Sequence, residues 1–96
     1  MLLKTIKFDE KNPNWSKDGK YNALLLRLLE EHLNDTVRHR GYIYLNQICE
    51  LLGDEWNPDD ENPCIKHDGV DRIAFIQFGV FHESDNSLLV QIHCYD

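Results

Sequence analysis

The chain lacks the features that mark membrane, secreted and nucleic-acid-binding proteins. No apolar run approaches the roughly 18 residues of a membrane span, and the N-terminus turns polar too early for a secretory signal. Its three cysteines, an odd number, do not suit a disulfide framework. Ten basic residues stand against 17 acidic ones, a net charge of −7, and no basic patch with interleaved aromatics occurs. We therefore expect a cytoplasmic protein with reduced thiols, no membrane association and no direct contact with nucleic acid.

The motifs of common enzymes are also absent. The five glycines are spread through the chain instead of forming a phosphate-binding loop, and no Gly-X-Ser-X-Gly sequence occurs. A chain of 96 residues supports one core, so we expect a single domain over residues 1–96. A ligand-sized pocket is hard to build in so small a domain. We predict that the protein is not an enzyme and binds no cofactor.

A long amphipathic helix is predicted over residues 20–40, where apolar residues recur every three to four positions. Ser16 or Asp18 can cap its start, and Gly41 suits the left-handed position after its end. Its leucines are assigned mainly to the core. Because they spread around much of the circumference, a seam with a second copy of the chain, a homodimer, stays an alternative.

The segment after this helix predicts a short strand and a short helix. Tyr42–Tyr44 is rich in residues that favour strands, and the apolar spacing of QICELLG indicates a helix that Asn46 caps and Gly53 ends. Cys49 falls on the apolar side of that helix. We predict that Cys49 and Cys94 are small core residues.

Three further segments have strand patterns. Residues 2–8 alternate and predict a short edge strand, and residues 88–95 alternate as well. Residues 71–81 are apolar on both alternating sets, which is typical of a central strand with both faces covered. We expect these last two to form a C-terminal β-hairpin. The fold class is therefore α+β, with a long and a short helix packed on a small antiparallel sheet; a second copy of the chain is a candidate to cover its other face.

Three stretches resemble a known group of proteins: IKFDEKNPNW near the start, RGYIYLNQICELLG at residues 40–53 and DGVDRIAFIQFGVF at residues 68–81. In this order and spacing they resemble small uncharacterised proteins of phages and integrative or conjugative elements of Firmicutes. The shared motifs are structural, with glycines that end helices and one within a strand. The resemblance implies a mobile-element context and no particular activity, and it does not extend to the acidic residues at 57–62.

Residues 54–71 hold most of the excess charge, with seven carboxylates against one lysine, a net of −6. Two asparagine–proline pairs punctuate this segment, which predicts extended or turn conformations. Carboxylates on a stiff loop with an aromatic anchor suit a basic protein partner. The predicted partner-binding residues are Asp54, Glu55, Trp56, Asp59, Asp60, Glu61, Asp68 and Asp71. The alternative is that the segment is only a solvated loop.

Metal binding is another reading of the ligand-type side chains in this part of the chain. Cys64 and His67 are ligand types for zinc, but strong zinc signatures show two paired motifs and this chain has one. His93 and Cys94 are adjacent on a predicted strand and point to opposite faces, so they do not complete a site together. We predict no metal, and a small metal-binding protein using Cys64 and His67 remains an alternative.

The sequence thus predicts a small acidic protein of a mobile element that acts non-enzymatically by protein–protein binding. An inhibitor or accessory factor directed at a host nucleic-acid-binding protein, such as a defence nuclease, fits the acidic segment because carboxylates can imitate phosphates. A toxin-neutralising immunity protein, which is also small and acidic, is the alternative.

Overall fold

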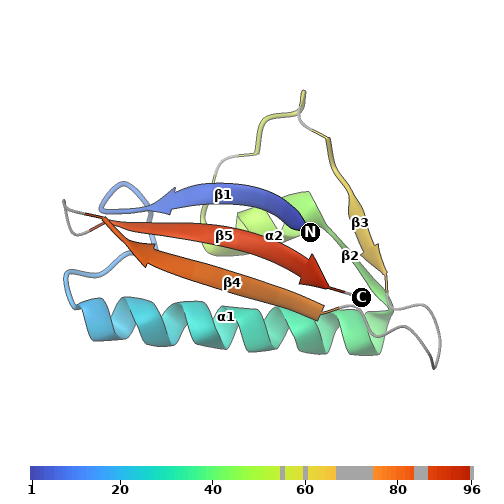
Figure 1. The fold of residues 1–96 in the computed structure, drawn as a ribbon, viewed down its shortest axis with the longest axis horizontal. Helices are drawn as coiled ribbons and strands as arrows, with labels where there is room; N and C mark the ends of the chain where they lie inside the picture. The colour runs from blue at the N-terminus through green and yellow to red at the C-terminus, as the bar shows by residue number, and fades with distance from the viewer. Residues whose placement is uncertain (55, 60, 67–74, 84–86, 96) are drawn as a thin grey trace.

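The computed structural model describes residues 1–54, 56–59, 61–66, 75–83 and 87–95. Its elements are β1 (Leu2–Phe8), α1 (Gly19–Arg40), β2 (Tyr42–Tyr44), α2 (Leu45–Leu52), β3 (Cys64–Lys66), β4 (Phe75–His82) and β5 (Leu88–Tyr95). A long helix, a short helix and antiparallel strands confirm the α+β class, with β4 and β5 forming the C-terminal hairpin (Figure 1). The short strand β3, inside the acidic segment, was not predicted.

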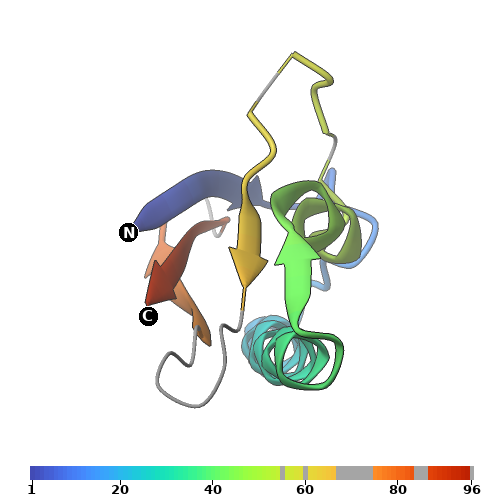
Figure 2. The same ribbon diagram turned by 90° about the vertical axis from the view of Figure 1, so that its right-hand side faces the viewer.

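The sheet has three strands in the order β1-β5-β4, all antiparallel, and β2 pairs with β3 in a separate two-stranded ladder. Both helices and the β2–β3 pair lie on one side of the three-stranded sheet (Figure 2). The prediction of a central strand at 71–81 is wrong for its described part, because β4 is an edge strand and β5 is central. Residues 71–74 lie outside the described residues.

The apolar pattern of β4 has a different cause from the one predicted. Phe75 and Phe81 lie on the sheet face away from the helices, and both are half-exposed, as is Tyr95 of β5. The rings of Phe75 and Tyr95 stack with centroids 5.3 Å apart. This outer face therefore carries aromatic side chains that pack on each other instead of being covered by another layer of described residues.

The long helix begins and ends as its sequence indicates. Asp18 is the N-cap, and its side chain accepts the Lys20 N–H at 3.0 Å, so Ser16 is not the cap. Gly41 ends the helix in the left-handed region, with φ +89°. The last turn carries basic residues next to the unpaired carbonyls, where positive charge is stabilising.

The short helix begins earlier than predicted. Tyr44, not Asn46, is its N-cap, and the Gln47 side chain accepts the Tyr44 N–H at 3.0 Å. Asn46 lies inside the first turn, and its N–H donates to the Asn62 side chain 2.9 Å away. The acceptor for this helix start therefore comes from 16 residues further along the chain, which local sequence does not reveal. Gly53 ends the helix with φ +79°, as predicted.

One core joins the helices to the sheet. Its largest fully buried side chains are Phe8, Leu26, Leu33, Val37, Ile48, Cys49, Leu52, Ile76, Val90 and Ile92. Cys49 is a core residue as predicted, and Cys94 is half-buried against the core. The leucine stripe of α1 is only partly core, because Leu24 and Leu28 are about half exposed on the opposite side of the helix.

The free edge of β4 is capped by polar side chains of α1. Asn34 accepts the Ile76 N–H at 2.7 Å and donates to the Ile76 carbonyl at 2.9 Å. Glu30 accepts the Phe78 N–H at 2.8 Å. An unpaired strand edge invites pairing with another chain, so these contacts protect the first half of β4.

Candidate partner-binding surface

The structure describes four of the eight predicted partner-binding residues: Asp54, Trp56, Asp59 and Glu61. The other four, Glu55, Asp60, Asp68 and Asp71, lie outside the described residues. We call residues 54–63 the acidic loop. It leaves the end of α2, protrudes beyond the rest of the molecule and returns to β3 (Figure 1).

The start of the acidic loop is tied to β1. The Asp54 carboxylate lies 3.2 Å from the Lys4 ammonium, and that ammonium lies 5.2 Å from the centre of the Trp56 ring. Trp56 is half-buried and packs against the core. Asp54 and Trp56 therefore have contacts within the chain that tie the start of the loop to β1 and the core.

The far end of the acidic loop is anchored as well. The Asn57 side chain accepts the Asp59 N–H at 3.0 Å, a local turn of the kind asparagine favours. Asn62 accepts the N–H of Asn46 in α2, and the Pro63 carbonyl accepts the Leu45 N–H at 3.0 Å. The loop then continues into β3, which pairs with β2. Contacts at its two ends thus tie the loop to β1 and to the start of α2.

Asp59 and Glu61 are exposed on this anchored loop. Asp59 occupies the turn, and Glu61 lies at the rim of a hollow of about 240 Å³ that Trp56, Leu3 and Lys4 also line. No described residue forms an ion pair with either carboxylate. Both are therefore exposed carboxylates without an ion-pair partner among the described residues.

The structure describes only one residue of the Cys64 and His67 pair considered for metal binding. Cys64 lies on β3 opposite Tyr44, while His67 is outside the described residues. Within residues 1–54, 56–59, 61–66, 75–83 and 87–95, no three His, Cys, Asp or Glu side chains are grouped closely enough to hold a metal ion.

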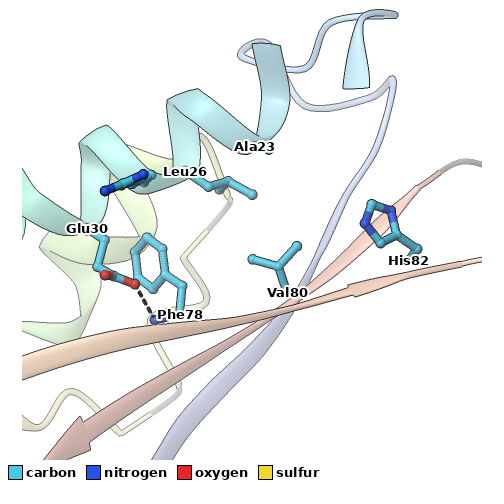
Figure 3. A pocket seen from close by; sticks show the side chains of 7 residues that line it. Ala23, Leu26, Glu30, Phe78, Val80 and His82 are labelled. Carbon is cyan, nitrogen blue, oxygen red and sulfur yellow. Dashed lines mark hydrogen bonds between the residues drawn. The ribbon is translucent and has the colours of Figure 1, made fainter. Parts of the chain in front are cut away.

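A second surface feature was not indicated by the sequence. A hollow of about 280 Å³ lies between the first half of α1 and the second half of β4, lined by Leu26, Arg27 and Glu30 on one side and Val80 and His82 on the other (Figure 3). Its walls come from segments about 50 residues apart. Only the approach of α1 to β4 creates it, and the spacing of polar residues within α1 gives no signal for it.

Among the described helices, none is long and apolar enough to cross a membrane. Comparison with known proteins found no matching family model, no matching curated protein and no matching solved structure.

Proposed function

We propose that the protein acts without catalysis, by binding a basic partner protein through the acidic loop. Asp59, Asp60 and Glu61 are the contact carboxylates. Asp54 and Trp56, also predicted from the sequence to meet the partner, contact Lys4 and the core at the base of the loop. Asp68 and Asp71 extend the same acidic segment in the sequence.

The observation that carries this proposal is an anchored loop with exposed carboxylates. Ordering a mobile loop on binding costs free energy, and each immobilised side chain adds to that cost. The contacts of Asp54, Asn57 and Asn62 already restrict the loop in the free protein, so less conformational freedom is lost on binding. Preorganised charge accelerates and orients binding to an oppositely charged surface.

A partner that itself binds nucleic acid fits this charge best. Such proteins carry clustered lysines and arginines that neutralise phosphates, and closely spaced carboxylates offer the same sign of charge to them. In a mobile element, an inhibitor of a host nuclease is a role of this kind. The proposal predicts competition between this protein and nucleic acid for one basic surface.

The test maps which carboxylates meet a partner. The purified full-length protein is mixed with a lysate of the cells in which it naturally occurs and treated with a carbodiimide, which joins carboxylates to lysines that touch them. Mass spectrometry then identifies the joined peptides. We expect cross-links from residues 59–61, lost at high ionic strength because screening shortens the reach of exposed charges to about 3 Å at 1 M salt.

A charge-matched pair of variants supplies the control. Asp59→Asn, Asp60→Asn and Glu61→Gln together should abolish the complex itself. Because amides do not react with the carbodiimide, the variants are compared without cross-linking, by co-elution with the identified partner in gel filtration. The same loss of charge at three exposed sites elsewhere, Glu10→Gln, Glu50→Gln and Glu83→Gln, should leave the complex intact. Equal loss in both variants would show a response to net charge alone, and unchanged binding in the first would refute the proposal.

A further inference from the structure

Side chains of α1 accept backbone N–H groups along the first half of the free edge of β4, but not along its second half. Ile76 and Phe78 direct their N–H groups away from β5, to Asn34 and Glu30. Backbone groups alternate sides along a strand, so the N–H and C=O groups of Val80 and His82 also point away from β5. No described residue makes a hydrogen bond to these groups.

Helix α1 diverges from β4 at the same place. Ile76, Phe78 and Val80 all face the helix side of the sheet, yet their exposed fractions rise from 1% through 9% to 39%. Figure 3 shows Leu26 and Val80 facing each other across the gap, with His82 at its outer end and the Glu30–Phe78 hydrogen bond closing its inner end. The edge is therefore open where the helix has moved away from it.

The gap continues past His82 as a second hollow of about 460 Å³, lined by Trp15, Lys17 and Gly19 at the start of α1. His82 lines both hollows, so they adjoin each other along the open edge. We call the two hollows together the edge groove.

We propose that the edge groove binds an extended peptide segment of another protein, which adds to the sheet as a strand beside Val80 and His82. Strand addition uses the edge N–H and C=O groups as its main contacts, and pockets for alternate side chains give selectivity. An apolar side chain fits between Leu26 and Val80. This site is separate from the acidic loop and does not depend on the function proposed for it.

Charges of both signs lie at the outer end of the groove. Lys17 and Glu83 both line it, and the Asp18 carboxylate already occupies the start of α1 as its N-cap. At the inner end, Glu30 already accepts the Phe78 N–H. The groove therefore favours an uncharged extended segment, with apolar residues on the alternate positions that face Leu26 and polar residues on the others.

A capped pentapeptide, acetyl-Thr-Val-Thr-Val-Thr-amide, is a suitable probe for the full-length protein labelled with ¹⁵N. We expect the Val80 and His82 amide signals to shift on titration and their exchange with solvent to slow. N-methylation separates strand pairing from side-chain contact, because alternate peptide amides face β4. Methylating one alternate set should weaken binding about tenfold or more, and methylating the other set should not.

The protein side is tested at Val80. Val80→Pro removes an N–H that faces away from β5, a place where proline is tolerated on an edge strand, and should abolish binding. Val80→Ala keeps the N–H and should retain it. If Val80→Pro does not fold, the difference in affinity between the two N-methylated peptides tests strand pairing by itself.

Several outcomes overturn the proposal. They are the absence of binding, equal effects of both methylation patterns, and shifts centred on Phe81 and Tyr95 of the outer sheet face. Shifts of Val80 that follow protein concentration without peptide would show that a second copy of the chain occupies the groove, which also overturns it.

Discussion

Removing the Asn34 side chain tests whether α1 holds the edge of β4. In Asn34→Ala, the Ile76 N–H and C=O lose their partners at 2.7 and 2.9 Å. A hydrogen bond contributes about 1 kcal/mol net, so the two together contribute about 2 kcal/mol. Alanine is better than asparagine inside a helix by up to about 0.7 kcal/mol, which offsets part of the loss. The expected decrease in the free energy of unfolding is about 1.5 kcal/mol.

Asn34→Leu should cost more than Asn34→Ala. The alanine leaves space in which water can reach Ile76, whereas leucine fills that space and leaves the Ile76 groups unsatisfied at about 1–3 kcal/mol each. Urea unfolding followed by circular dichroism measures both variants, and the slope of the transition should not change. For the alanine variant the melting temperature should fall by about 6–12 °C.

His32→Ala is the matched control, because His32 is an exposed position of the same helix with a similar propensity. We expect it to change stability by no more than about 0.5 kcal/mol. Hydrogen exchange adds a local measurement: the Ile76 amide should lose protection in Asn34→Ala while the Gln77 amide, which faces β5, keeps it. A stability of Asn34→Ala equal to that of His32→Ala, with Ile76 still protected, would refute the role assigned to Asn34.

Two further predictions concern the glycines that end the two helices and the ion pair at the start of the acidic loop. Gly53→Ala should destabilise more than Gly41→Ala: both sites have positive φ, but a Cβ at residue 53 would lie 2.7 Å from the Asn12 side-chain oxygen while one at residue 41 meets nothing within 4 Å. Gly41→Ala should cost about 1–2 kcal/mol in thermal unfolding, and equal costs would contradict the clash. Asp54→Asn should lower stability by at most about 1 kcal/mol, because its pair with Lys4 lies near the surface; a double-mutant cycle with Lys4→Met measures the coupling.

The sequence by itself determined the elements whose signals are local. The 3.6-residue apolar period, Asp18, Gly41 and Gly53 define the helices through contacts within a few residues. The alternation of residues 2–8 and 88–95 likewise predicts β1 and β5. These patterns suffice for the α+β class, because helix and strand periodicity follow from which residues face the core.

Only the tertiary structure decided the order of the strands and the use of individual polar residues. A strand that is apolar on both faces is compatible with a central position or with an edge whose outer aromatics pack on a neighbour, as Phe75 does on Tyr95. The contacts of Asn34 with Ile76 and of Glu30 with Phe78 span 42 and 48 residues, so no local pattern reveals them. The same holds for the pairing of Asp54 with Lys4. Charge in a segment shows in the sequence, but which carboxylates stay free for a partner depends on where distant cations come to lie.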